Sequence, residues 1–316
     1  MRVTARIVAS GVAAVLLLAA VQAQAAEPES CRTVRFADVG WTDITATTAL
    51  TSRILEGLGY ETRTDVLAVP VTYASMKNKD IDVFLGNWMP TMEADRKPYV
   101  EDKSVEVVGA NLEGAKYTLA VPAYTYEAGL KSFGDVAKFK DQLEGQIYGI
   151  EPGNDGNRLI LGMIEKDQFG LGGFELVESS EQGMLAQLDR ATRRKEPMVF
   201  LGWEPHPMNT KYEMKYLEGG DEVFGANYGG ATIYTNVRAG YREECPNVGK
   251  LISNLKFTLP MENELMGAIL FDGIDPAQAA ETWLKANLAA IEPWLQGVTT
   301  VDGKPAVEAL QAELGS

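Results

Sequence analysis

The sequence contains little cysteine, little histidine and little positive charge. Its 316 residues include two cysteines, one histidine, and 29 Lys+Arg against 44 Asp+Glu, which gives a formal net charge of −15. So few ligating side chains cannot build a zinc cluster, and we expect no metal site. The acidic surplus argues against nucleic acid as a partner, because phosphates need a basic face.

Motifs of the common enzyme classes are also missing. The sequence has no nucleophile elbow, no phosphate-binding Walker loop and no glycine set of a dinucleotide-binding fold. Glu93 and Asp95 follow a tryptophan as a carboxylate pair, but Arg96 and Lys97 beside them indicate a solvated turn. We therefore expect a protein that is not an enzyme and that uses no cofactor.

Long apolar runs are missing after the first 26 residues. Arg2 and Arg6 precede an apolar stretch over 7–20, and a small-x-small motif ends at Ala25. This order is typical of a secretory signal peptide, and the stretch is too short to span a bilayer comfortably as a membrane anchor. We predict cleavage near Ala25/Ala26 and a periplasmic mature protein.

Export changes the interpretation of the two cysteines, Cys31 and Cys245. In an oxidising compartment, a single disulfide between them is the simplest arrangement, and two buried thiols are the alternative. The bond would close a loop of about 210 residues, for which loop entropy gives roughly 5 kcal/mol at most.

The pattern along the mature chain predicts two α/β units, as its length of about 290 residues also suggests. In the first unit, strands and helices alternate in the order expected of a mostly parallel sheet. The strands are expected over 33–37, 60–67 and 81–85, and the helices over 43–58 and 71–78.

The alternation of strands and helices restarts after Gly114. Strands are expected over 117–121, 146–150, 174–178 and 198–201, with helices after Asn154 and from a capping box, Ser179-x-x-Gln182, to about Arg194. The tail beyond residue 246 is helical. A Cys31–Cys245 bond would return this tail to the first unit. We therefore predict one discontinuous lobe, 27–114 plus 226–316, an inserted lobe, 115–225, and two crossing strands as the hinge.

Tryptophans stand at the carboxyl ends of three predicted strands, where open α/β sheets bind ligands. These are Trp41, Trp88 and Trp203, whereas Trp283 and Trp294 lie on the helical tail and are expected in the core. Core packing is the alternative for any single tryptophan. Three of them, divided between two units, favour a binding site.

Tryptophan faces attract poorly hydrated cations, above all quaternary ammonium groups, and each ring contributes about 0.5–2 kcal/mol. A sugar site would need many polar side chains, which these strand ends lack. An amino-acid site would need an arginine for the carboxylate, and only Arg158 lies near a candidate loop. The expected ligand is a small quaternary ammonium compound.

Several stretches resemble the substrate-binding proteins of ABC importers for glycine betaine, choline and related solutes, and are most similar to the choline-binding branch. They are Gly40-Trp41-Thr42-Asp43, Gly59-Tyr60, Asp82-Val83-Phe84, Asn87-Trp88-Met89-Pro90-Thr91, Tyr117 to Pro122, Glu151-Pro152-Gly153, Gly202-Trp203-Glu204-Pro205-His206 and Lys215 to Glu218. The resemblance implies a two-lobed type II periplasmic binding protein fold, with mixed, mostly parallel sheets flanked by helices. It also implies hinge closure and delivery of the ligand to a permease in the inner membrane.

The resemblance also implies the site residues. The aromatic box would be Trp41, Trp88, Tyr117 and Trp203, with Asp43 beside the cation and Asn154 and Asp155 at the choline hydroxyl. Helix N-capping is the alternative for the last three residues, and Thr42 is a second candidate cap of the first helix. We expect a monomer that binds choline. The alternatives are glycine betaine, another betaine or carnitine, for which His206 would assist the carboxylate, and a sensor module that presents its ligand to a receptor.

Overall fold

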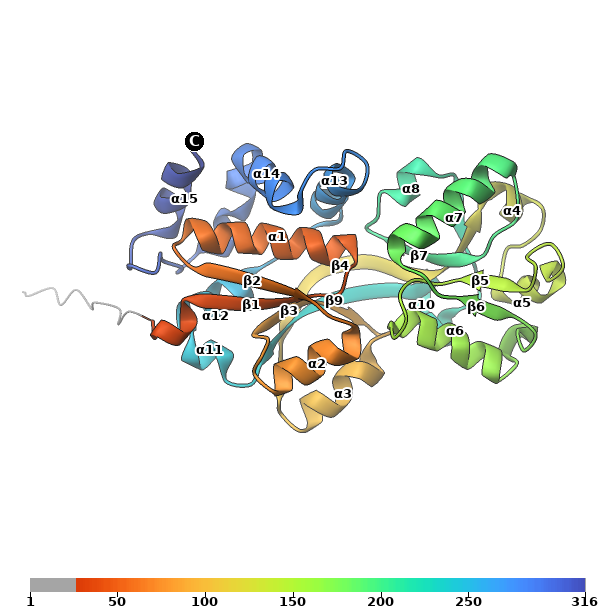
Figure 1. Ribbon diagram of the computed structural model, residues 1–316, viewed down its shortest axis with the longest axis horizontal. Coiled ribbons are helices and arrows are strands. Elements are labelled where there is room, and N and C mark those ends of the chain that lie inside the picture. The colour runs from red at the N-terminus through yellow and green to blue at the C-terminus, as the bar shows by residue number, and fades with distance from the viewer. Residues whose placement is uncertain (1–26, 316) are drawn as a thin grey trace, which may run out of the picture.

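The computed structural model describes residues 27–315, so the predicted signal peptide lies outside the described residues. The elements form two halves along the long axis of the molecule, and two long strands run from one half into the other (Figure 1). The strands form one continuous sheet in the order β2-β1-β3-β9-β4-β7-β5-β6, and β8 pairs with β4.

The first half contains the predicted alternation of strands and helices. Strand β1 pairs in parallel with β2 and with β3. The elements are β1 (Thr33–Asp38), α1 (Thr42–Gly57), β2 (Glu61–Val66), α2 (Val69–Lys77), β3 (Val83–Met89) and α3 (Glu93–Glu101). Strand β3 is longer than predicted, so Trp88 lies inside the strand and not after it.

The second half is built around parallel pairing of β5 with β6 and with β7. Its elements are α4 (Ala123–Glu127), α5 (Phe133–Val136), β5 (Gln146–Tyr148), α6 (Asp155–Glu165), β6 (Glu175–Val177), α7 (Glu181–Arg194), β7 (Phe200–Glu204), α8 (Met208–Lys211), β8 (Met214–Tyr216), α9 (Asp221–Phe224) and α10 (Ala226–Gly229). The predicted capping box at Ser179 is wrong by one residue. Ser180 is the N-cap, because its Oγ accepts a hydrogen bond from the Gly183 N–H at 3.0 Å.

Strands β4 (Val105–Pro122) and β9 (Gly230–Arg238) are the two crossing strands, and they pair antiparallel. Sequence pattern alone placed a strand only over 117–121 of this region. The pairing is irregular between Val107 and Ala115, where three register shifts interrupt the ladder. Such β-bulges bend a strand locally and increase its twist. The bends fall where the chain passes from one half to the other.

The C-terminal helices return to the first half, where α1 packs against α13, α14 and α15. The helices are α11 (Tyr241–Glu244), α12 (Pro246–Asn254), α13 (Leu259–Leu270), α14 (Pro276–Ile291) and α15 (Ala306–Leu314). Trp283 and Trp294 are buried here, and Trp294 packs against Phe257 with ring centroids 5.3 Å apart. Both tryptophans are core residues, as predicted.

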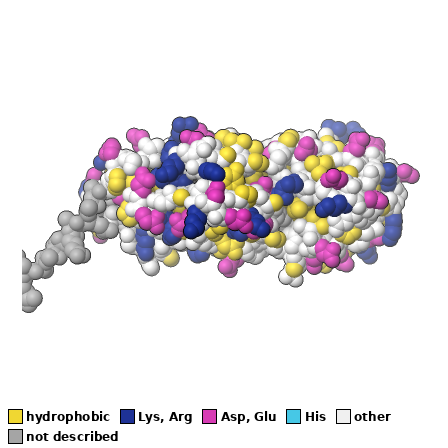
Figure 2. All heavy atoms as spheres, turned by 90° about the horizontal axis from the view of Figure 1, so that it is seen from below, with side chains coloured by type: hydrophobic (Ala, Val, Ile, Leu, Met, Phe, Trp, Pro, Cys, Tyr) yellow, Lys and Arg dark blue, Asp and Glu magenta, His cyan; other side chains and the backbone are white. Residues whose placement is uncertain are grey.

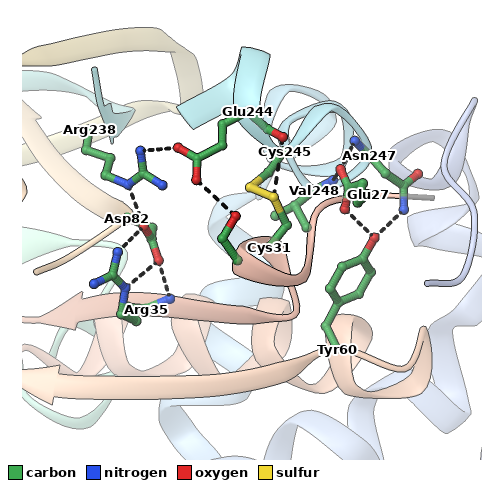
Figure 3. Close-up of a disulfide and its surroundings, with 11 residues drawn as sticks. Glu27, Cys31, Arg35, Tyr60, Asp82, Arg238, Glu244, Cys245, Asn247 and Val248 are labelled. Atoms are coloured by element: carbon green, nitrogen blue, oxygen red, sulfur yellow. Dashed lines mark hydrogen bonds and ion pairs between the residues drawn. A yellow bond between two sulfur atoms is a disulfide. The ribbon is translucent and has the colours of Figure 1, made fainter. Parts of the chain in front are cut away.

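A disulfide between Cys31 and Cys245 fastens the start of the described chain to the α11–α12 junction (Figure 3). The Cα atoms are 5.5 Å apart, and the alternative of two free thiols is wrong. Close by, Glu27 accepts a hydrogen bond from the Tyr60 hydroxyl at 2.7 Å and from the Val248 N–H at 3.2 Å. The N-terminal segment is therefore held by covalent and polar contacts to sequence more than 200 residues away.

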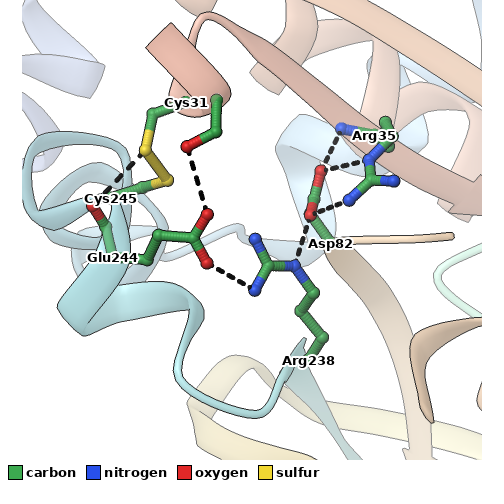
Figure 4. Close-up of polar contacts among 7 residues, drawn as sticks. Cys31, Arg35, Asp82, Arg238, Glu244 and Cys245 are labelled. Atoms are coloured by element: carbon green, nitrogen blue, oxygen red, sulfur yellow. Dashed lines mark hydrogen bonds and ion pairs between the residues drawn. A yellow bond between two sulfur atoms is a disulfide. The ribbon is translucent and has the colours of Figure 1, made fainter. Parts of the chain in front are cut away.

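Next to the disulfide, a partly buried ion-pair network, with Asp82 and Arg238 at its buried centre, joins three elements of this half (Figure 4). The Asp82 carboxylate accepts hydrogen bonds from Arg35 Nε at 2.8 Å and from Arg238 Nε at 2.7 Å. Arg238 also pairs with Glu244 at 2.9 Å. Removal of one partner from a buried ion pair leaves the other charge uncompensated and destabilises the fold. Loss of any one of these side chains should therefore lower stability.

The surface carries charges of both signs. On the face seen from below, acidic and basic side chains are interspersed, and hydrophobic side chains gather in a band near the middle (Figure 2). Within residues 27–315, no helix is both long and apolar enough to cross a bilayer.

Candidate functional site

A small pocket lies where elements of both halves meet. The space between its lining residues is small, which limits a ligand to a small molecule. The first half supplies the N-terminus of α1 and strand β3, and the second half supplies β7 and the segment after β5. The lining residues are Trp41, Asp43, Trp88, Tyr117, Ile150 and Trp203.

The aromatic rings hold one another in place through edge contacts. The Tyr117 centroid lies 5.8 Å from that of Trp88 and 6.4 Å from that of Trp203, with interplanar angles of 60° and 84°. These three rings and Trp41, the fourth aromatic side chain of the pocket, are each at most 5% exposed. Because these rings are buried, a cation between their faces would be largely desolvated, the condition in which cation–π attraction is strongest.

Asp43 contributes a carboxylate to the pocket. Its Oδ2 accepts a hydrogen bond from Trp88 Nε1 at 3.1 Å, whereas Oδ1 is buried and has no donor. Burial and then the charge of Glu181 raise the pKa of Asp43 to about 8. The N-capping alternative is wrong for Asp43 and for Thr42: helix α1 begins at Thr42, and its N-cap, Trp41, makes no side-chain capping bond.

Asn154 is the N-cap of α6, which was the predicted alternative to a role in ligand binding. Its Oδ1 accepts a hydrogen bond from the Asn157 N–H at 2.6 Å, which leaves its Nδ2 buried without an acceptor. Asp155 does not cap the helix. Neither of its carboxylate oxygens has a donor in hydrogen-bonding geometry, and burial raises its pKa to about 6. Capping therefore leaves the amide of Asn154 and both oxygens of Asp155 free.

The Tyr117 side chain connects the pocket to this pair. Its hydroxyl lies against the first turn of α6, where a Cβ at Gly156 would stand 2.0 Å from the hydroxyl oxygen, so only glycine fits. The hydroxyl is buried without a partner. Burial, followed by the charges of Asp155 and Glu151, raises the pKa of Tyr117 well above its ordinary value. Asn154 and Asp155 do not line the pocket themselves; they lie next to Tyr117, which does.

His206 does not line the pocket. Its ring packs against Trp203 with centroids 4.7 Å apart. Its Nδ1 accepts a hydrogen bond from the Met208 N–H at 2.9 Å, so Nε2 carries the proton of the neutral ring and donates to Glu181, also at 2.9 Å. With both nitrogens engaged, His206 has none free for a ligand carboxylate.

Three acids near the pocket, of which Glu151 is half-buried and the other two are buried, were not predicted as site residues. Glu151 accepts a hydrogen bond from Trp41 Nε1 at 2.6 Å, and burial raises its pKa to about 7. Glu181 accepts from the backbone and side chain of Thr42. Burial and the charge of Asp43 raise the pKa of Glu262 well above its ordinary value. Glu151 belongs to a quoted motif and could have been found. Glu181 and Glu262 carry no local signal.

The fold and the pocket define a class: a two-lobed periplasmic-type solute-binding protein, in which a pocket lies where two α/β lobes joined by crossing strands meet. Residues 32–286 match the family model OpuAC, the substrate binding domain of ABC-type glycine betaine transport systems. The chain belongs to this family of ABC-transporter substrate-binding proteins, which are transport proteins and not enzymes. Proteins of this family work outside the cytoplasm.

Solved structures and a curated relative agree with this family. The chain is similar to an ABC-transporter choline binding protein in complex with choline, at 68% identity and a TM-score of 0.90, over 92% of this chain and 100% of that one. It is also similar to lactococcal OpuAC in its closed form with glycine betaine, at 27% identity and a TM-score of 0.73, over 83% and 98%. The glycine betaine/carnitine transport binding protein GbuC of Listeria monocytogenes is 32% identical over 52% of this chain and 53% of that protein.

Proposed function

We propose that this chain captures choline in the aromatic pocket and delivers it to an ABC permease in the inner membrane. The observation that carries the proposal is the combination of four aromatic rings with one buried Asp43 oxygen that has no donor. A quaternary ammonium group offers a positive charge without N–H donors, so it neutralises Asp43 and leaves no donor of its own unsatisfied. The 68% identical protein with choline supports this assignment.

The electrostatics around the pocket favour a cation over a zwitterion. The charge of Glu181 raises the negative potential at Asp43, and none of the six residues that line the pocket is basic. Transfer of an unpaired charge into a buried site is costly. A positive ligand group relieves the repulsion among these acids, whereas a neutral group would not.

The polar end of the pocket suits a hydroxyl group better than a carboxylate. Asn154 offers an amide donor, Tyr117 a hydroxyl, and Asp155 two buried acceptor oxygens. A choline hydroxyl can donate to Asp155 and accept from Asn154. A betaine carboxylate at the same place would face Asp155 and Glu151, and its charge would oppose theirs. We therefore place choline ahead of glycine betaine.

Ligand entry requires the lobes to separate, because all six residues that line the pocket are buried. We assign 27–114 plus 226–316 to lobe I and 115–225 to lobe II, with β4 and β9 as the hinge. Contacts across the cleft include Trp41 with Glu151, and Arg158 of α6 with Asp95 of α3. The rings of Trp41, Trp88, Tyr117 and Trp203 form an aromatic cage, and closure is favoured when both halves of this cage contact one cation. We propose that a monomer, exported to the periplasm and cleaved near Ala25/Ala26, works in this way.

Calorimetric titration of the mature protein with choline and with glycine betaine tests the assignment. We expect choline to bind much more tightly than betaine. Betaine binding equally or better would contradict it and would assign the polar end to a carboxylate. Binding of neither would remove the proposed function altogether.

A further inference from the structure

Glu181 connects the two lobes at the first turn of α1. Its Oε2 accepts a hydrogen bond from the Thr42 N–H and its Oε1 from the Thr42 hydroxyl, both at 2.8 Å. The N-cap of α1 supplies no side chain to this turn. The free N–H of the helix is therefore capped by a carboxylate from the other lobe. In Figure 1, α1 and α7 lie on the same side of the sheet, at either side of the middle of the molecule.

The Glu181 carboxylate also contacts a residue that supports the aromatic pocket from the lobe II side. Its Oε1 accepts the Nε2–H of His206, whose ring packs on Trp203. Thr42 lies between Trp41 and Asp43 in the sequence. Glu181, which is 1% exposed, thus contacts residues that adjoin three lining residues of the pocket. These lining residues are Trp41, Asp43 and Trp203. Hydrogen bonds to an ionised acceptor are about twice as strong as neutral ones.

We propose that Glu181 is a positioning and specificity-determining residue for the cationic ligand: it clamps lobe II onto α1 and adds a fixed negative charge beside Asp43. The clamp forms only when the lobes close, because its donors and its acceptor belong to different lobes. The charge attracts a cation in the cage and repels a second anion. This inference rests on the proposed function, and it goes beyond the direct ligand contacts assigned there.

The two roles of Glu181 can be separated by measuring choline affinity from pH 6 to pH 9 in the mature protein. The acids near Asp43 are Glu181 on α7 and Glu262 on α13. In Glu181→Gln, we expect the high-pH affinity to fall about tenfold, since an attractive charge is lost. We also expect the midpoint of the profile to move to lower pH, since Asp43 then ionises more easily.

Loss of packing alone would lower affinity without moving the midpoint, so an unmoved midpoint would overturn the charge role. The clamp is tested by Thr42→Val, which removes one donor and keeps the charge, against Thr42→Ser, which keeps the donor. We expect the valine variant to bind about three- to tenfold more weakly at every pH and the serine variant to bind as the parent does. Equal binding by both would overturn the clamp, whether or not the glutamine variant folds.

Glu175→Gln, at an exposed acid of β6, is the matched control and should leave the profile unchanged. If the parent protein does not bind choline at all, the proposed function fails. If the parent binds choline and the Glu181 and Thr42 variants behave as the parent does, only the inference on Glu181 fails.

Discussion

Trp88 donates its indole N–H to Asp43 Oδ2 at 3.1 Å and leaves Oδ1 of the same carboxylate buried without a donor. One side chain therefore serves two purposes: it fixes the orientation of a cage ring and it presents an unsatisfied acceptor oxygen to the pocket. An unpaired buried acceptor costs about 1–3 kcal/mol, more when charged. A bound cation removes that cost, which links the geometry of the pocket to the charge of its ligand.

Replacing Trp88 or Trp203 with alanine should weaken choline binding by about 1–3 kcal/mol, because cation–π and apolar contacts are lost. Titration calorimetry measures the change. Phenylalanine at the same positions keeps a ring face and should recover part of the affinity. Unchanged affinity in both alanine variants would show that these rings only pack the core.

Asp43→Asn should weaken choline binding by on the order of 2 kcal/mol, since the partner charge is lost while Trp88 keeps an acceptor. The melting temperature without ligand should not fall, because a buried carboxylate that lacks a full set of donors is replaced by a neutral group. Calorimetry and thermal denaturation together check both statements. Full choline affinity in a folded Asn variant would exclude Asp43 as the counter-charge.

Choline binding should release a proton near pH 7. Burial and the charge of Glu181 raise the pKa of Asp43 to about 8, so without a cation beside it the carboxyl is mostly protonated at pH 7. A bound cation favours the ionised form and lowers this pKa. Affinity should therefore rise with pH up to about 8 and level off above it. Titrations in buffers of different ionisation enthalpy count the protons; no release at pH 7, or a flat profile, would contradict the assignment.

Removal of the disulfide should destabilise lobe I without changing the site. The double variant Cys31→Ser with Cys245→Ser reopens a long loop, at a cost of roughly 5 kcal/mol at most in the loop-entropy description. Denaturant unfolding measures the loss. Choline affinity at low temperature should stay the same, because the bond lies at the α11–α12 junction, and Figure 1 shows these two helices toward the end of the first half that faces away from the second half. A large loss of affinity would mean that the bond also shapes the cleft.

Sequence pattern predicted the features that depend on neighbours in the chain. The alternation of strands and helices before Leu85 and the buried tail tryptophans are local signals of periodicity and propensity. Two crossing strands were predicted as the hinge, but most of their residues were missed. The first part of β4 contains Gly109, Asn111 and Gly114, and its pairing with β9 joins segments more than 100 residues apart. Strands held by distant partners and interrupted by bulges leave a weak local pattern.

Candidate site residues were predicted where the residue type itself indicates the chemistry, as for tryptophan and cations. They were missed where the role of a residue depends on a contact with a distant part of the chain. The tryptophans stand in repeated strand-end motifs, and the structure brings them around one pocket. Glu181 appears in the sequence as the start of an ordinary helix, and its role depends on Thr42, 139 positions earlier. Likewise, only the partners of His206 show that both of its nitrogens are occupied.

Comparison of choline with its uncharged carbon analogue, 3,3-dimethylbutan-1-ol, tests the central claim most directly. The two molecules share shape and hydroxyl group and differ in the positive charge alone. If the cage and Asp43 recognise charge, calorimetry at pH 8 should show the analogue binding at least a hundredfold more weakly, a difference of about 2.7 kcal/mol. Comparable affinities for the two compounds would show that the pocket selects shape and apolar surface, and the account of a cation site would be wrong.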